Sequence, residues 1–176
     1  RAALLVIAAL GGGLLFSGCA APAGGPIQRN SEIVQRYFER WANHGDTRVA
    51  DELIAANLVL RHPHVTVKGL EPYKQSMAAF QAAFPDLHFA VEDRVSQGDR
   101  VLVRWTMTGT QRGEFQGRLA SGKAIRVAGM SLFRIERGLI QEIWVNMDRL
   151  GFQEQLGLLP SAPTTEPPTV DRSPLK

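Results

Sequence analysis

The fold is decided by residues 87–107, which read LHFAVEDRVSQGDRVLVRWTM. Apolar residues alternate with polar ones in two runs, on either side of the short segment Gln97-Gly98-Asp99. Alternation with a period of two is typical of a strand that buries one face, and glycine between polar residues is typical of a tight turn. The stretch therefore predicts a long β-hairpin.

A second hairpin is predicted downstream on the same grounds. Apolar and polar residues alternate over residues 125–135, Arg137-Gly138 supplies a turn, and residues 140–145 carry the chain back toward Asp148. Short turns that contain glycine join antiparallel strands closely. The second half of the domain is therefore expected to form an antiparallel sheet.

Upstream of residue 87 the periodicity is helical. Apolar residues recur at intervals of three and four over residues 33–41, which predicts an amphipathic helix capped near Asn30 or Ser31. A second, short helix is expected to start at Asp46, and a third to follow Gly69. Helices first and antiparallel strands after them predict an α+β fold.

A strongly twisted sheet that curls around three helices leaves a concave cavity, which is where small apolar ligands bind. We expect this cavity to accept a small apolar ligand. Seven large side chains stand at positions expected to face it: Tyr37, Trp41, Phe84, Phe89, Trp105, Met130 and Trp144.

Composition excludes several classes of protein. The chain of 176 residues is long enough for one ordinary domain, and 44% hydrophobic with 21% charged residues is close to the globular average. The formal charge of +3 comes from 20 basic and 17 acidic side chains spread along the chain, so we expect no nucleic-acid partner. A single cysteine excludes an internal disulfide framework.

The N-terminal region is typical of a targeting segment. Residues 2–16 form an apolar run that is shorter than the roughly 20 residues of a membrane span and fits a signal peptide. The run ends in FSGC at residues 16–19, which resembles the lipobox of bacterial lipoproteins. That resemblance implies a signal peptide over residues 1–18 and a lipid on the thiol of Cys19. The protein would then be anchored in the bacterial cell envelope, facing the periplasm or the cell exterior; an uncleaved anchor helix is the alternative.

Two segments rich in proline bracket the predicted domain. Residues 19–29 contain proline and glycine and predict a flexible tether. Residues 160–176 contain too few apolar residues to offset the entropy of ordering and predict a disordered tail. The folded domain is therefore expected over residues 30–159.

Five groups of short segments stand in a distinctive order within that domain: Ala83-Phe84-Pro85-Asp86-Leu87; Gly98-Asp99-Arg100-Val101; Gly109-Thr110 with Gly113-Glu114-Phe115-Gln116-Gly117; Asp148-Arg149-Leu150-Gly151; and Gln155-Leu156-Gly157. In order and spacing they resemble the SnoaL-like polyketide cyclase (ester cyclase) family. The resemblance implies a cone-shaped α+β barrel of the nuclear transport factor type, usually a homodimer, with a deep apolar pocket.

The same resemblance implies a chemistry, which is cofactor-free aldol ring closure of an aromatic polyketide ester. It places the base at Asp148 and a frequent family histidine at His62. Where many relatives have a histidine the chain has Gln111, which can donate a hydrogen bond but cannot transfer a proton near neutral pH. Asn146 or Gln111 would then supply the hydrogen bond to the enolate oxygen.

Each of these residues also has a structural interpretation. Asp148 stands where it would cap a helix that begins at Arg149, and His62 could be a solvated histidine at a strand end. His62-Pro63-His64 is a His-x-His pair, but a zinc site needs a third ligand that the sequence does not place nearby, so we expect no metal.

Two functional hypotheses follow. The first is an exported, lipid-anchored enzyme of the SnoaL-like type, which abstracts a proton from a small apolar carbonyl compound without a cofactor. The second is a binding module on the same fold, which holds an apolar ligand or a partner without chemistry. One scaffold carries both kinds of function, so the fold alone does not separate them.

Overall fold

The computed structural model describes residues 25–159. The predicted signal peptide, Cys19 and the C-terminal tail lie outside these residues. Within them, no helix is long and apolar enough to span a membrane.

The elements in chain order are α1 (Pro26–Arg36), the π-helical turn η1 (Tyr37–Ala42), α2 (Thr47–Leu53), β1 (Ile54–His62), β2 (Val65–Lys68), α3 (Leu70–Ala83), β3 (His88–Gln97), β4 (Arg100–Thr110), β5 (Ala124–Glu136), β6 (Leu139–Met147) and α4 (Arg149–Leu156).

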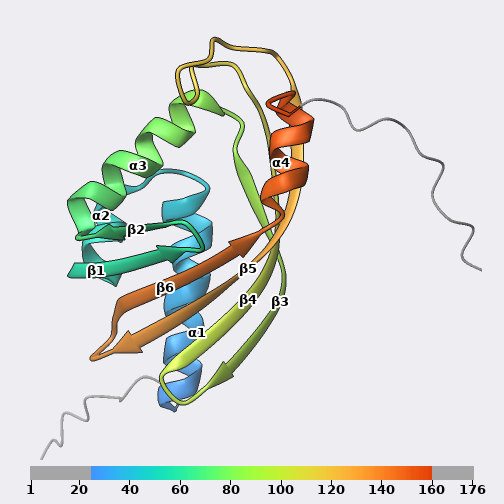
Figure 1. Ribbon diagram of the computed structural model, residues 1–176. Coiled ribbons are helices and arrows are strands. Elements are labelled where there is room, and N and C mark those ends of the chain that lie inside the picture. Colours follow the sequence, from blue (N-terminus) through green and yellow to red (C-terminus); the bar gives the residue numbers. More distant parts are fainter. Residues whose placement is uncertain (1–24, 160–176) are drawn as a thin grey trace, which may run out of the picture.

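The strands form one six-stranded sheet in the order β2-β1-β6-β5-β4-β3. The long strands bend into a curved wall beside α1, and α3 lies across the open side of that wall (Figure 1). The predicted α+β fold with a strongly curved sheet is confirmed. The sheet is mixed rather than wholly antiparallel, because β1 pairs with β6 in parallel. These two strands are far apart in the chain and are joined through α3 and both long hairpins, so no short turn forces them to be antiparallel.

Both long hairpins form as predicted, β3 with β4 and β5 with β6. The second turn places Arg137 at φ 53° and Gly138 at φ 79°. Two consecutive residues with positive φ are typical of the type I′ turn, whose twist matches that of the flanking strands. In β3 the register shifts between Val91 and Asp93, which reverses the alternation of buried and exposed positions beyond that point.

The first helix begins earlier than predicted. Gly25 is its N-cap and Pro26 its first residue, so the predicted cap at Asn30 or Ser31 is wrong, and residues 26–29 of the predicted tether are helical. Proline suits the first turn because its φ is already helical and the missing N–H has no partner there in any helix. The second and third helices start after Asp46 and Gly69 as predicted.

One hydrophobic core fills the space between the helices and the inner face of the sheet. The indole of Trp105 lies in it, 2% exposed, and donates a hydrogen bond from Nε1 to Ser131 Oγ at 2.9 Å. Gly129 stands opposite Trp105 on β5, where a Cβ atom would come within 2.3 Å of the ring. The close approach of the indole to the backbone therefore requires glycine at this position.

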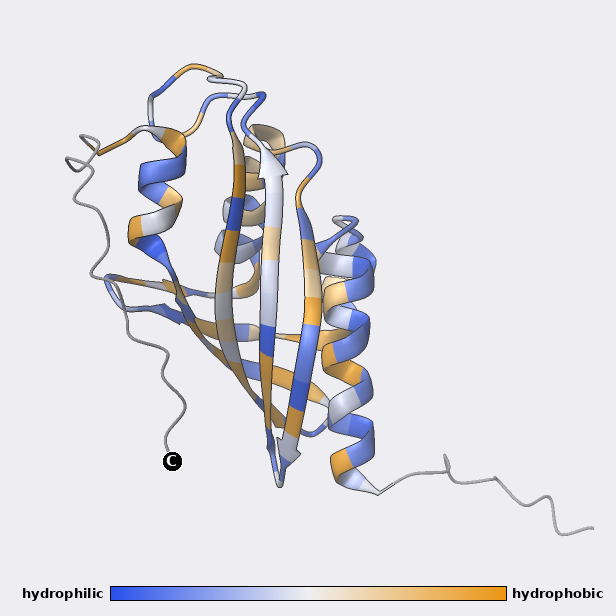
Figure 2. Cartoon of the chain, turned by 90° about the vertical axis from the view of Figure 1, so that its right-hand side faces the viewer, coloured by the Kyte–Doolittle hydropathy of each residue, from blue (hydrophilic) through white to orange (hydrophobic). Residues whose placement is uncertain are grey.

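The opposite face of the sheet, here called the outer face, also carries apolar side chains. Figure 2 shows hydrophobic and hydrophilic residues alternating along the long strands. The register aligns Val95, Leu102, Leu132 and Trp144 in one row across β3, β4, β5 and β6. Val95 is 60% exposed and Leu102 40% exposed, so this row faces solvent in the described chain.

Candidate functional site

Asp148 stands at the junction between β6 and α4. Its carboxylate Oδ1 accepts a hydrogen bond from the backbone N–H of Gly151 at 2.8 Å, and its own N–H donates to the carbonyl of Ala128 at 3.1 Å. The predicted helix cap is therefore confirmed. The side chain is exposed, and its Oδ2 has no hydrogen-bond or ion-pair partner among residues 25–159.

A groove of about 800 Å³ runs along the outer face and reaches Asp148. We call it the outer groove. It is open to solvent, and its charged rim is formed by Glu92, Arg100 and Arg104. Its floor and its end at β6 are formed by Leu102, Met130, Leu132, Trp144, Asn146 and Asp148.

The sheet register explains how the residues of β5 and β6 meet there. Leu132 pairs with Trp144 and Met130 pairs with Asn146, so three apolar side chains and one amide lie side by side on this face. Asp148 follows Asn146 at the same parity, as the sequence predicted. A carboxylate, an amide and an indole therefore share one apolar groove.

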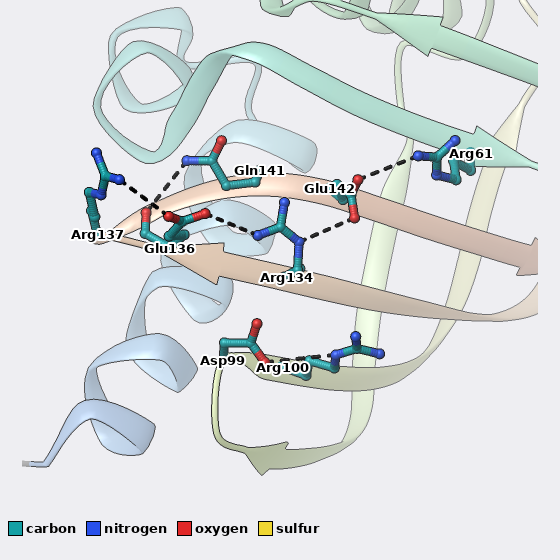
Figure 3. A network of polar contacts seen from close by, with 8 residues as sticks. All are labelled: Arg61, Asp99, Arg100, Arg134, Glu136, Arg137, Gln141 and Glu142. Carbon is teal, nitrogen blue, oxygen red and sulfur yellow. Dashed lines mark hydrogen bonds and ion pairs between the residues drawn. The ribbon is translucent and has the colours of Figure 1, made fainter.

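A network of charged side chains lies beside Trp144, and Figure 3 shows its members Arg61, Arg134, Glu136 and Glu142. Glu142 accepts hydrogen bonds from Arg61 at 3.4 Å and from Arg134 at 3.2 Å, and the Arg61 guanidinium lies 5.9 Å from the centroid of the Trp144 ring. Arg134 also bonds Glu136 at 3.2 Å. A guanidinium at this distance attracts the face of the indole, so the network fixes the aromatic wall of the groove before any ligand arrives.

The charges at the β3 side of the groove are paired with each other. Arg104 forms an ion pair with Glu92, and Glu92 also accepts a hydrogen bond from the hydroxyl of Thr106. A cation whose charge is already matched attracts an anionic ligand weakly. The groove therefore suits an uncharged ligand.

His62 lies at the end of β1 and faces the other way. Arg61 pairs with Trp144 on the outer face, so the next residue, His62, shares its parity with buried Leu60. Partial burial lowers the pKa of the His62 imidazole, and the positive charge of Arg149 lowers it further. His62 is close enough to Arg149, the residue after Asp148, to feel its charge, but no hydrogen bond or ion pair joins His62 to Asp148 among residues 25–159.

The lowered pKa of His62 predicts a pH dependence of stability. As the pH falls, His62 binds a proton near pH 6.5 in the unfolded chain and only at a lower pH in the folded chain. The free energy of unfolding should therefore fall as the pH drops below 6.5. The loss should stop below the lower pKa of the folded state. Urea unfolding at pH 7.5 and at pH 5 measures this loss of stability. His62→Gln should reduce the difference between the free energies of unfolding at the two pH values. His64→Gln, at an exposed histidine in the same turn, is the matched control; an equal effect of both substitutions would contradict the assignment.

Gln111 is fully engaged in the loop between β4 and β5. It is 4% exposed, its Nε2 donates to the carbonyls of Gly113 at 3.3 Å and Leu119 at 3.2 Å, and its Oε1 accepts from Ser121 Oγ at 2.6 Å. Both N–H groups and the oxygen have partners, so no donor is left for an enolate oxygen. Gln111 shapes the loop instead.

The seven side chains expected to line one cavity do not lie together. Four of them are buried in the core: Tyr37, Trp41, Phe84 and Trp105. Phe89 is partly buried beside them. Met130 and Trp144 lie on the outer face, because the register pairs Met130 with Arg104 and Gly129 with Trp105. Parity within one strand identified which residues share a face, but not which face meets the helices.

The sequence reasoning also missed the charges around the groove. Arg61, Glu92 and Glu142 carry no motif, and only the strand register brings them to Trp144 and Arg104. The one available signal was that arginines alternate along the strands with apolar residues.

Across residues 25–159, no three side chains of His, Cys, Asp or Glu are arranged to hold a metal ion.

Comparison with known proteins assigns the chain to a family. The sequence profile of the SnoaL-like polyketide cyclases matches residues 31–156, which is most of the folded domain. The chain belongs to the SnoaL-like polyketide cyclase family. Membership supports a cofactor-free, cyclase-like role. No curated protein matches the chain.

Solved structures agree with this placement. A candidate SnoaL-like polyketide cyclase from Jannaschia sp. CCS1 is 28% identical, with a TM-score of 0.71 over 80% of this chain and 100% of that one. IdmH, a candidate polyketide cyclase from Streptomyces antibioticus, is 28% identical, with a TM-score of 0.64 over 73% of this chain and 98% of that one. TsrD from Streptomyces laurentii is 30% identical, with a TM-score of 0.66 over 75% and 97%.

Proposed function

We propose that the chain is a cofactor-free, cyclase-like enzyme that removes a proton from a small apolar carbonyl compound bound in the outer groove. The observation that carries the proposal is the presence of Asp148 and Asn146 in one groove with the ring of Trp144. The apolar floor would hold the body of the substrate, and the two polar side chains would act on its carbonyl end.

The groups can be assigned to the steps of an aldol closure. Oδ2 of Asp148 takes a proton from the carbon next to a carbonyl, and the electron pair moves onto the carbonyl oxygen as an enolate. The side-chain amide of Asn146 donates a hydrogen bond to that oxygen. The enolate carbon then attacks a second carbonyl of the same molecule, and the new alkoxide takes the proton back from Asp148. Atoms and charge balance without a cofactor.

The test needs only the first of these steps. The wild-type protein should accelerate deuterium exchange at the activated methylene of a bicyclic β-keto ester, measured by proton NMR against buffer at the same pH. Exchange no faster than in buffer, with the ester shown to bind, would contradict the enzyme hypothesis.

A second candidate function is a binding module for an apolar ligand or a partner. It is favoured by the exposure of Asp148 and by the hydrogen bond that its carboxylate accepts from Gly151, because both are accounted for by a helix cap alone. Saturable quenching of tryptophan fluorescence by the same ester, without exchange, would support this function instead.

We further propose that the protein is anchored in the bacterial cell envelope through a lipid on Cys19. The support is the apolar run of residues 2–16, the FSGC segment that ends it, and the absence of any other cysteine in the sequence. Acyl chains contribute about 0.8 kcal/mol per buried methylene, so they can hold a protein whose signal peptide has been removed.

Cys19→Ala should move the mature protein from the membrane fraction to the soluble fraction of cells that express the precursor. The reason is that alanine offers no sulfur for acylation. Fractionation followed by mass spectrometry of the N-terminus measures both the location and the lipid. Ser17→Ala, two residues away, is the control and should stay with the membrane; a cleaved Cys19→Ala protein that also stayed there would contradict the anchor.

A further inference from the structure

One end of the domain gathers the start of α1 and the turns of both long hairpins (Figure 1). Asn30 Nδ2 donates a hydrogen bond to the carbonyl of Gly98 at 3.1 Å, which joins α1 to the turn between β3 and β4. The N–H of Ile135 donates to the carbonyl of Asp99 at 2.8 Å, which joins the same turn to the end of β5. We call this end of the domain the tether end. It comprises residues 25–32, 97–100 and 134–139.

The segment that connects Cys19 to the tether end is short. Gly25 follows Cys19 by six residues, and an extended chain spans at most about 3.6 Å per residue, so a lipid on Cys19 keeps Gly25 within about 22 Å of the membrane surface. The 13 residues of β5 lead away from the tether end over about 40 Å, at about 3.3 Å per residue. The segment is therefore too short for the opposite end of the domain to rest on the membrane.

The tether end exposes a large apolar side chain. Ile27 lies in the first turn of α1 and is 48% exposed. Of the exposed large apolar side chains among residues 25–159, it is the nearest to Cys19 along the chain. Such a side chain gains free energy when it enters the boundary between lipid headgroups and acyl chains. Ile27 therefore suits contact with a membrane that the anchor already holds nearby.

The same end presents exposed guanidinium groups. Figure 3 shows Arg137 at the tip of the hairpin of β5 and β6, and Arg100 beside the turn of β3 and β4. Their ion pairs are long, 3.5 Å from Arg137 to Glu136 and 3.7 Å from Arg100 to Asp99, and the two arginine side chains are 89% and 56% exposed. Exposed pairs of this kind contribute little free energy, so both guanidiniums can turn to the oxygens of a phosphate. The charged residues of the tether end are Arg29, Arg100, Arg134 and Arg137 against Glu32, Asp99 and Glu136.

We propose that the tether end docks on the membrane surface, where Ile27 enters the headgroup region and Arg100 and Arg137 bind the phosphates of anionic phospholipids. The proposal rests on the lipid anchor proposed for Cys19. Docking holds the long strands upright on the membrane. The outer groove, whose lining extends from Arg100 to Asp148, then has one end beside the bilayer and the other end away from it.

Single fluorescent labels measure this orientation. The full lipidated chain is placed in vesicles of phosphatidylethanolamine and phosphatidylglycerol that contain a small share of lipid with a nitroxide on its headgroup. Because acylation blocks Cys19, an introduced cysteine is the only free thiol. The nitroxide should quench a label on Gln28→Cys, at the tether end. It should not quench a label on Glu154→Cys, which is exposed on α4 at the opposite end.

Matched substitutions in the Gln28→Cys protein test the docking contacts. Fluorescence lifetimes give the ratio of docked to undocked domains. Arg137→Gln should lower this ratio by about fivefold, the usual effect of one arginine near an anionic surface, and Ile27→Ser should lower it as well. Arg118→Gln and Leu119→Ser change an exposed arginine and an 84% exposed leucine in the loop between β4 and β5, and should leave the ratio unchanged. In vesicles of uncharged phosphatidylcholine the effect of Arg137→Gln should shrink.

The mass of the N-terminal peptide separates the failure of this proposal from the failure of the anchor. A chain without a lipid on Cys19 contradicts the anchor and overturns the docking with it. If Cys19 carries the lipid but the labels at positions 28 and 154 are quenched equally, the anchor stands and the docking is overturned. Equal effects of Arg137→Gln and Arg118→Gln on the docked ratio would also overturn it.

Discussion

Asp148→Asn is expected to lower the protein-accelerated deuterium exchange of a bound β-keto ester by about two to four orders of magnitude, the usual contribution of a positioned general base. The amide has the shape of the carboxylate but cannot accept the proton. Asparagine is also a good helix cap, so the hydrogen bond from the Gly151 N–H and the start of α4 should be kept. Exchange rates of both proteins are measured by proton NMR at saturating ester.

Two controls make this result interpretable. The affinity for the ester should change little, because the apolar floor of the groove is untouched. Asp86→Asn makes the same chemical change at a carboxylate that accepts hydrogen bonds from the N–H and hydroxyl of Thr110, away from the groove, and should leave exchange unchanged. If Asp148→Asn exchanges the ester as fast as the wild type, Asp148 is not the base and the binding module becomes the better account.

Gly129→Val is expected to lower the free energy of unfolding by about 1–3 kcal/mol, which is the usual cost of overpacking a dense core. A Cβ atom at this position would already come within 2.3 Å of the Trp105 ring, and valine adds two methyl groups. The indole would have to move, and its hydrogen bond to Ser131 would be strained. Urea unfolding measures the change, with the slope m showing that the transition remains comparable.

Ala128→Val is the matched control for this substitution. It adds a β-branched side chain to the next residue of β5, which is exposed, and should change the free energy of unfolding by no more than about 0.5 kcal/mol. Equal stability of Gly129→Val and the wild type would show that the contact with Trp105 is not tight.

The sequence predicted the local elements well because their signals are local. Alternation and a glycine turn were enough for the hairpin of β3 and β4, and Gly69 was enough for the start of α3. The predicted start of α1 near Asn30 or Ser31 was wrong because Pro26 begins the helix without a polar side chain as its cap. Signals within one element were therefore sufficient, except at the start of α1, where a proline took the place of a polar cap.

The candidate site was predicted only in part because register is not a local property. Parity showed that Trp144, Asn146 and Asp148 share a face. It could not show that Met130 faces away from Trp105, since this depends on which residue of β4 each residue of β5 meets. The role of Gln111 likewise depends on a loop whose hydrogen bonds join residues up to twelve positions apart.

The place of β6 in the sheet has a consequence for how the chain folds. Within residues 25–159, β6 is the last strand along the chain but lies between β1 and β5, and its pairing with β1 is the one parallel pairing. Until β6 has been synthesised, β1 and β5 each expose an unpaired edge, and the hairpin of β1 and β2 cannot join the other strands. Unpaired edges invite association with other chains, and distant pairings slow folding. A nascent or truncated chain that ends at β5 is thus a pair of half-sheets prone to aggregate, and the arrival of one strand converts it into a continuous sheet.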